Sequence, residues 1–194
     1  MKDLSFLDRR PIVVALAGPN GAGKTTFYHA HLAPAGLRFV NADVLAGEFK
    51  VDAYAAARLA DALRRELVRR RESFVFETVF SDPAGEKLRL LTEAGTAGYA
   101  VVLCFIGLES AALSEERVAM RVSQGGHDVP TDKLLSRYPR TLANLKAALR
   151  ALPHVLIYDN SDLADPFRRV ALYQDGRCVE RAENLPAWLK GRLE

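Results

Sequence analysis

The chain has 194 residues, of which 49% are hydrophobic and 26% are charged, and its formal net charge is +3. This length suits one domain with a sizeable core, and the hydrophobic content excludes a disordered chain. The weak positive charge favours phosphorylated ligands but is too small for a dedicated nucleic-acid binder. We therefore expect a single domain over residues 1–194, for which a small phosphorylated ligand is favoured over nucleic acid.

The cysteines and the N-terminal segment indicate the compartment. Cys104 lies in an apolar run and Cys178 lies near the C-terminus, without metal-ligand spacing or a disulfide framework, as is typical of a reducing compartment. A basic pair before an apolar stretch superficially resembles a signal peptide, but the stretch is too short and Asp3 and Asp8 precede it. No run approaches the roughly 18 apolar residues that span a membrane. We predict a cytoplasmic protein without a membrane partner.

The first predicted element is an apolar strand over residues 12–17, which leads directly into the sequence Gly-Pro-Asn-Gly-Ala-Gly-Lys-Thr. This is a complete phosphate-binding loop, followed by a helix over residues 25–32. Its glycines let successive backbone N–H groups turn toward one anion, Lys24 can reach the terminal phosphates, and the Thr25 hydroxyl can hold Mg²⁺. The residues predicted to bind ATP here are Gly18, Pro19, Asn20, Gly21, Ala22, Gly23, Lys24, Thr25 and Thr26.

Beyond the loop, apolar β-rich runs alternate with helical patterns, which predicts a parallel sheet covered by helices. The further strands are expected at residues 38–41, 73–77, 100–106 and 154–159, and the helices at residues 52–71, 82–97, 110–124 and 131–152. Two short runs, 171–174 and 178–182, flank Asp175-Gly176 and predict a hairpin. Residues 186–194, with Trp188, predict a short docking helix. The fold class is α/β, with a five-stranded parallel sheet, helices on both faces and a C-terminal β-hairpin.

Three of the predicted strands have a carboxylate at or just beyond their end. Ligands of such sheets bind beyond the carboxyl ends of the strands, so Asp43, Glu77 and Asp159 are the first candidates for chemistry. Asp43 could orient a hydroxyl substrate beside the γ-phosphate and accept its proton. Each acid could instead only cap a turn or helix.

The Glu77 strand ends in three apolar residues followed by an acidic one. In nucleotide hydrolases and kinases, the acid at the end of such a run supports Mg²⁺ through water or binds substrate. Thr78 and Ser81 could add hydroxyl contacts to a substrate. The run that ends at Asp159 has the same form, so the pattern does not identify which strand belongs to the site. Only the order of the strands can separate the two.

Arginines form a second group of candidates. Arg117 and Arg121 are four apart on a predicted helix and share one face, and Arg137 and Arg140 are three apart at the start of the next. The glycine-rich segment 125–130 between the pairs has the flexibility of a hinge. Two basic pairs around such a segment suit a lid over polyphosphate, at about residues 117–140, although a solvated basic face with a turn has the same spacing. The denser basic run at 64–71 predicts an amphipathic helix with a solvated side.

These motifs together resemble the zeta-toxin-like family of P-loop kinases, particularly its short single-domain bacterial members. The resemblance covers roughly residues 13–161. It rests on the phosphate loop, Phe39-Val40-Asn41-Ala42-Asp43, Phe76-Glu77-Thr78, the segment from Arg117 to Val122 with Gly125-Gly126-His127-Asp128-Val129-Pro130, Arg137-Tyr138, and Tyr158-Asp159-Asn160-Ser161. It implies a three-layer P-loop kinase-like fold in which the Glu77 strand lies beside the strand of the phosphate loop and the Asp159 strand lies farther out.

The resemblance also implies roles for individual residues. Asp43 matches the catalytic base, Lys24 and Thr25 hold ATP and Mg²⁺, and the turn with Asn160 lies near the adenine. Arg117, Arg121 or Arg137 would supply the lid contacts to phosphate. From the motifs and the resemblance together we predict three catalytic residues, Asp43, Lys24 and Arg121; further ATP contacts at Arg117 and Asn160; and substrate contacts at Asn41, Asp43, Glu77, Thr78, Ser81 and Arg137.

Well-studied members of this family phosphorylate UDP-N-acetylglucosamine and are silenced by an antitoxin. The resemblance therefore implies an ATP- and Mg²⁺-dependent kinase of a small-molecule hydroxyl, such as that of a nucleotide-sugar, which acts as a toxin with an antitoxin partner. The chain departs from those members after Glu77, where Thr78-Val79-Phe80-Ser81 replaces Gly-Thr and an arginine. Because that segment faces substrate in the family, the acceptor stays open. The alternatives are a nucleotide-binding switch or NTPase without a metabolite acceptor, and a nucleoside or nucleic-acid kinase.

Overall fold

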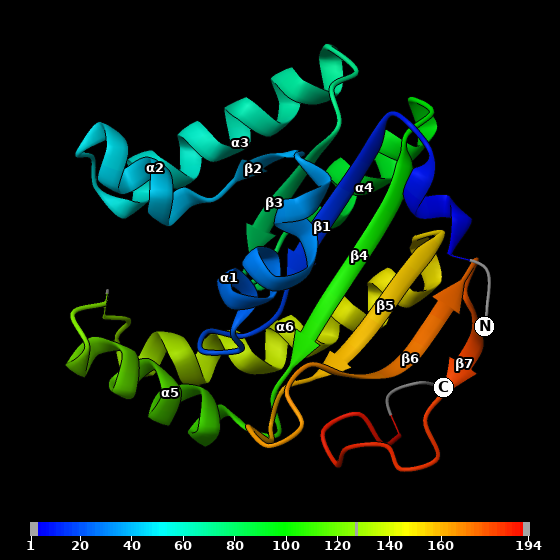
Figure 1. Cartoon of the computed structure of the whole chain (residues 1–194). Helices are drawn as coiled ribbons and strands as arrows, with labels where there is room; N and C mark the ends of the chain where they lie inside the picture. The colour runs from blue at the N-terminus through cyan, green and yellow to red at the C-terminus, as the bar shows by residue number, and fades with distance from the viewer. Residues whose placement is uncertain (1–3, 127, 192–194) are drawn as a thin grey trace.

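The computed structural model describes residues 4–126 and 128–191, in which seven strands form one mixed sheet (Figure 1). The strand order is β2-β3-β1-β4-β5-β6-β7; the first five strands of the chain are parallel, and β6 and β7 are antiparallel. The strands are β1 (Ile12–Ala17), β2 (Arg38–Val40), β3 (Phe74–Thr78), β4 (Ala100–Gly107), β5 (His154–Asp159), β6 (Arg168–Gln174) and β7 (Arg177–Arg181). The predicted α/β class with a five-stranded parallel region is confirmed, and the predicted hairpin extends the same sheet.

Helices cover both faces of the sheet. Side chains of α3, α4 and α6 form one core layer, and side chains of α1 and the N-terminal 3-10 helix form the other. The helices are α1 (Lys24–Phe27), continued by a π-helix (Tyr28–Leu32) and a 3-10 turn (Ala33–Ala35), α2 (Ala42–Phe49), α3 (Ala53–Arg69), α4 (Glu86–Thr96), α5 (Ala111–Ser123), α6 (Thr131–Ala151) and the N-terminal 3-10 helix (Ser5–Asp8). No helix among the described residues is long and apolar enough to cross a bilayer.

Strand β1 explains why the phosphate loop is fixed so firmly in the fold. All six of its residues are buried, because it lies between β3 and β4 with a layer of helices on each face. Val13, Ala15 and Ala17 pack against α3, α4 and α6, and their neighbours in sequence pack against the α1 side. Side chains alternate between the faces of a strand, so a strand buried on both faces is apolar throughout.

Three elements differ most from the sequence prediction. The helix predicted over residues 82–97 begins only at Glu86, after Gly85 in the left-handed region. Helix α2 was not predicted: Asn41 caps it by accepting hydrogen bonds from the backbone of Asp43 and Val44, and Asn41 had been assigned to the end of the preceding strand. The predicted helix over residues 186–194 is wrong within the described part, where residues 187–191 form turns. The segment nevertheless docks on the body, because the Trp188 side chain is only 4% exposed.

The Trp188 side chain anchors this C-terminal segment. Its indole Nε1 donates to Asp159 Oδ1 at 2.9 Å, and its ring packs near Phe105. We expect Trp188→Ala to lower the free energy of unfolding by about 3–5 kcal/mol, which lowers Tm by roughly 6–20 °C for a chain of this size. Calorimetry measures the shift. Leu163→Ala, at a side chain that is 70% exposed, is the control and should leave Tm nearly unchanged. Equal, small shifts for both variants would contradict the anchoring role.

Candidate active site

The strand order decides which acidic strand end adjoins the phosphate loop. β3 pairs directly with β1, with Leu16 opposite Glu77 and Ala17 opposite Thr78. β5 is separated from β1 by β4, so Asp159 lies farther out. The implied placement of these two strands is therefore confirmed. Glu77 is the strand-end carboxylate beside the loop.

The phosphate loop has the backbone shape that its glycines permit. Gly18 has φ +145°, and a Cβ there would lie 2.1 Å from the carbonyl oxygen of Ile106. Gly23 has φ +80° immediately before α1, and a Cβ there would lie 2.9 Å from the Asn160 amide nitrogen. Only glycine fits both the left-handed backbone and the close approach at these two positions.

Lys24 is held inside this loop. Its side chain is 6% exposed, and Nζ donates to the Pro19 carbonyl oxygen at 2.9 Å. Burial lowers the pKa of Lys24, and the negative charges of Glu77 and Asp43 oppose that change, whereas Arg121 adds to it. These couplings place both carboxylates and Arg121 within electrostatic range of the lysine. An anion bound in the loop would offset the desolvation of Lys24.

Glu77 links the loop to the neighbouring strand β2. Its Oε2 accepts from Thr25 Oγ1 at 2.8 Å and from Asn41 Nδ2 at 3.0 Å, and its Oε1 lies 3.9 Å from Lys24 Nζ. The side chain is 14% exposed. The Glu77 carboxylate thus contacts a hydroxyl, an amide and an ammonium group beside the phosphate loop.

Asp43 lies in the first turn of α2, where its backbone N–H bonds the Asn41 side chain at 2.8 Å. The residue is exposed. Its carboxylate forms no hydrogen bond or ion pair with another residue in the described ranges 4–126 and 128–191. Because Asn41 caps α2, Asp43 is not needed for that task, and its carboxylate is available to a ligand.

On the other side of the loop, the segment after β5 supports the loop backbone. Asn160 is buried, donates through Nδ2 to the Ala22 carbonyl oxygen at 3.0 Å, and accepts from the Phe167 backbone at 3.2 Å. Asp159 Oδ1 accepts from Ser161 and Trp188, and its Oδ2 lies 3.5 Å from Arg168. The Asp159 carboxylate is therefore occupied by contacts within the fold, and Asn160 contacts the phosphate loop rather than open solvent.

We expect Asn160→Leu to weaken binding of Mg-ATP about tenfold, equivalent to about 1.4 kcal/mol, because the buried Ala22 carbonyl loses its donor. Isothermal titration calorimetry measures the change. Asn184→Leu, an exposed asparagine in the C-terminal segment, is the matched control and should bind as wild type does. Wild-type affinity in Asn160→Leu would show that the loop does not depend on this support.

Helix α5 contacts the loop from the same side as Asn160. Ser114 Oγ donates to the Asn20 carbonyl oxygen at 2.6 Å, and Arg117 donates to the Ser161 carbonyl oxygen at 2.9 Å. Burial lowers the pKa of Arg117, and Glu116 and Asp159 oppose the shift. Arg121 is exposed on the same helix and acts on Lys24 as described above. The structure thus brings two of the four predicted arginines to the loop.

The second arginine pair, Arg137 and Arg140, forms no bond with the phosphate loop. Arg137 is half-buried and Arg140 is exposed on the early turns of α6, and neither forms a hydrogen bond or ion pair with a residue of the described chain. His127 of the glycine segment lies outside the described residues. Among the remaining predicted contacts, Thr26 is exposed after the loop, and Thr78 and Ser81 are half-buried after Glu77.

The residues present fit a magnesium ion. Thr25 Oγ1 and the Glu77 carboxylate are oxygen donors within 2.8 Å of each other, and Mg²⁺ prefers oxygen ligands. The described residues contain no group of three or more His, Cys, Asp or Glu side chains that could hold a metal alone. This agrees with the usual Mg²⁺ site of nucleotide enzymes, in which phosphates supply part of the coordination.

One contributor to the site was not predicted: Ser114, which supports the loop. Asn41 was predicted as a substrate contact, and the structure gives it a further role, because it caps α2 and donates to Glu77. Ser114, Arg117 and Arg121 recur at helical spacing, so the loop-facing side of this helix could have been identified from the sequence. The cap at Asn41 could not, because the sequence left α2 itself unrecognised.

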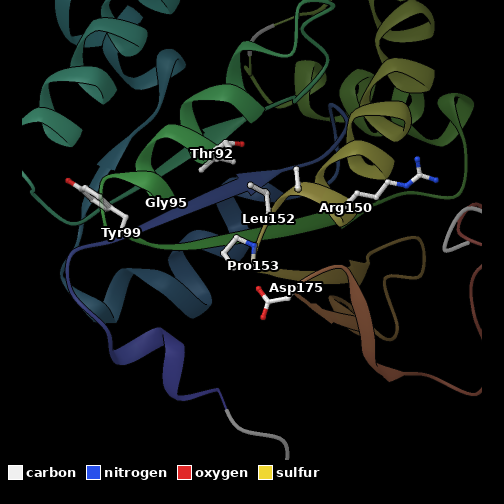
Figure 2. A pocket seen from close by; sticks show the side chains of 9 residues that line it. Thr92, Gly95, Tyr99, Arg150, Leu152, Pro153 and Asp175 are labelled. Atoms are coloured by element: carbon white, nitrogen blue, oxygen red, sulfur yellow. The ribbon is translucent and has the colours of Figure 1, made fainter.

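A cavity of about 580 Å³ lies at the opposite end of the sheet, where β4 and β5 begin (Figure 2). Tyr99 precedes β4, Pro153 precedes β5, and Asp175 lies in the turn between β6 and β7. The phosphate loop follows the carboxyl end of β1, so this cavity is not part of the nucleotide site.

Solved structures with the same fold include a chain of the PezAT toxin-antitoxin system of Streptococcus pneumoniae, with 17% identity and a TM-score of 0.55 over 93% of this chain and 76% of that one. A chain of the AvrRxo1-ORF1:AvrRxo1-ORF2 complex has 20% identity and a TM-score of 0.65 over 90% of this chain, which spans 62% of that one. A gluconokinase from Sinorhizobium meliloti 1021 has 21% identity and a TM-score of 0.50, over 82% and 89%.

These similarities establish the three-layer P-loop kinase-like fold, and the predicted resemblance to zeta-toxin-like P-loop kinases is confirmed at that level. No curated protein matches the sequence. A family model does match: residues 13–141, from β1 through the phosphate loop, Glu77 and α5 into α6, fit the model described as AAA domain. The chain therefore belongs to the AAA domain family of P-loop proteins.

Proposed function

We propose that the protein transfers the γ-phosphate of ATP to a hydroxyl of a small molecule, with Asp43 as the general base. The supporting observation is the arrangement of Asp43, Glu77 and Lys24 at the phosphate loop, in which the Asp43 carboxylate has no structural partner among the described residues. A carboxylate beside the terminal phosphate can accept the proton of an attacking hydroxyl. Lys24 and Arg121 stabilise the charge that develops on the phosphoryl group.

The nucleotide is held on the β4 and β5 side of the loop in this proposal. Gly18 to Thr26 bind the phosphates, and Arg117 and Asn160 border the adenine side. Thr25 holds Mg²⁺, which when bound neutralises charge on the phosphates. A solved complex of AvrRxo1-ORF1 with AvrRxo1-ORF2 contains ATP, which supports the choice of nucleotide. Residues 117–140 act as a lid within one domain, 1–194.

The acceptor binds on the β2 and β3 side, near Asn41, Asp43, Glu77, Thr78, Ser81 and Arg137. A nucleotide-sugar such as UDP-N-acetylglucosamine is the favoured class, on the strength of the ordered motifs shared with zeta-toxin-like kinases. The experiment incubates purified protein with Mg-ATP and a panel of UDP-sugars and nucleosides, and mass spectrometry detects the gain of a phosphoryl group. Absence of any phosphorylated acceptor, with steady hydrolysis of ATP, would favour the alternative of a nucleotide-dependent switch.

A toxin role with an antitoxin partner is part of the proposal, supported by the structural similarity to a chain of the PezAT system. Induced expression of wild type should arrest bacterial growth, whereas Lys24→Ala should not. Equal growth of both strains would contradict the toxin role without bearing on phosphoryl transfer.

A further inference from the structure

The first four residues of the connection between β3 and α4, residues 79–82, are held by hydrogen bonds from α6. Thr141 is fully buried, and its Oγ1 donates to the Val79 carbonyl oxygen at 3.0 Å. Asn144 Nδ2 donates to the carbonyl oxygens of Phe80 at 2.9 Å and Asp82 at 3.1 Å. Three hydrogen bonds from one helix thus fix the backbone of residues 79–82.

Phe80 shows how tightly this connection is determined. It has φ +60°, which is unusual for a bulky residue, and its side chain is 1% exposed in the core. Its backbone N–H donates to Thr78 Oγ1 at 3.0 Å. Such a conformation is unfavourable for a residue with a bulky side chain and persists only where the surroundings enforce it. Asn144 bonds the carbonyl group of Phe80 itself, and the other two bonds hold the carbonyl groups of Val79 and Asp82.

A charged network joins α3 to α4 beside the same segment. Arg64 is 3% exposed, its guanidinium lies 5.0 Å from the centre of the Phe76 ring, and it pairs with Asp61. Asp61 also accepts from Lys87 Nζ at 2.9 Å, and the Lys87 backbone N–H lies 3.4 Å from Asp82 Oδ2. Helices α6 and α4 therefore bond the residues that follow Glu77, and Asp61 of α3 bonds Lys87 of α4.

The connection lies on the acceptor side of the phosphate loop. The nucleotide side is bordered by Asn160 and α5, whereas Glu77 and Asp43 lie on the side of β3 and β2. Residues 79–82 follow directly after Glu77 and Thr78. Ser81 forms no hydrogen bond with any residue in the described part of the chain, so its hydroxyl is available to a ligand.

We propose that Thr141 and Asn144 are positioning residues for the phosphoryl acceptor: from α6 they fix residues 79–82 of the connection and, through it, the acceptor-facing groups of Thr78 and Ser81. This inference rests on the proposed function. Neither residue bonds the phosphate loop or the segment around Asn160, so they act on acceptor affinity and not on ATP affinity.

Thr141 offers a matched pair of variants. Thr141→Val keeps the shape and removes the donor, and Thr141→Ser keeps the hydroxyl. We expect Thr141→Val to raise the KM for the acceptor, with UDP-N-acetylglucosamine as the first probe, about tenfold, as expected for the loss of one buried hydrogen bond. The KM for ATP should change less than about twofold, and Thr141→Ser should restore the acceptor KM. Asn144→Leu, at a half-buried position, should repeat the pattern if Thr141→Val folds poorly.

Amide hydrogen exchange provides a second measurement that needs no acceptor. Exchange in peptides spanning 78–83 should quicken in Thr141→Val and not in Thr141→Ser, while peptides of the phosphate loop stay unchanged. Equal rises in both KM values, or faster exchange with an unchanged acceptor KM, would overturn the positioning role. If wild type phosphorylates no acceptor, the proposed function fails, and equal exchange of 78–83 in the two variants would separately overturn the inference.

Discussion

Replacing Asp43 with asparagine is expected to reduce phosphoryl transfer about 10²- to 10⁴-fold, the range that general bases contribute. The amide keeps the shape of the carboxylate but cannot accept the proton of an attacking hydroxyl. Asn41, not Asp43, caps α2, so the helix should remain in place. Single-turnover kinetics measure the loss in the rate of transfer.

Two controls separate this effect from damage to the fold. Glu48→Gln removes an exposed carboxylate from the same helix and should transfer phosphate at the wild-type rate. Mg-ATP affinity and Tm of Asp43→Asn should also stay close to wild type. Full transfer by Asp43→Asn would show that another group, or the phosphate itself, takes the proton.

Replacing Lys24 with methionine should reduce transfer about 10²- to 10³-fold, the effect of removing one preorganised group that stabilises the transition state. Methionine fills a similar volume in this buried position without the ammonium group. Unlike Asp43→Asn, this variant should also bind Mg-ATP more weakly, since the charge contacts phosphate in the ground state too. Calorimetric titration and single-turnover rates separate the two effects.

The pH dependence of binding gives a further test of Lys24. Burial holds the pKa of Lys24 below the usual value of 10.5 in the free protein, and bound phosphates stabilise the ammonium form and raise that pKa. Between the two values, binding takes up a proton, so Mg-ATP affinity should fall as the pH rises through this alkaline window. Titrations in buffers of different ionisation enthalpy detect the proton. Uptake that persists in Lys24→Met would assign it to another group.

The sequence predicted most of the fold because its strongest signals are local. Strands β1 and β5 begin and end where their apolar runs do, and α6 continues through Pro139 as its long amphipathic pattern indicated. Helix α2 escaped because it has only eight residues, includes a glycine, and buries none of its side chains. The sequence predicts a helix at the C-terminal turns because the buried Trp188 gives an apolar signal that does not require a helical backbone.

The candidate site was predictable where function rests on residue type at a fixed spacing. The phosphate loop and the pair Arg117 and Arg121 are of this kind. Contacts between segments distant in sequence were not predictable: Glu77 accepts from Asn41 at the end of the neighbouring strand β2, and Thr141 lies 62 positions from the carbonyl group that it bonds. The order of the strands brings these partners together, and no local sequence pattern predicts that order. The residues of the site could therefore be predicted from the sequence more readily than the residues that hold them in place.

The most direct test of the central claim follows the γ-phosphate itself. Protein preloaded with ATP radiolabelled at the γ-phosphate is mixed with Mg²⁺ and the panel of UDP-sugars and nucleosides, and the label is followed through one turnover. A phosphotransferase with Asp43 as base predicts that wild type moves the label to an acceptor and that Asp43→Asn does so at least about 10²-fold more slowly. Label that appears only as inorganic phosphate, at one rate with and without the panel, would contradict the account and identify a nucleotide hydrolase.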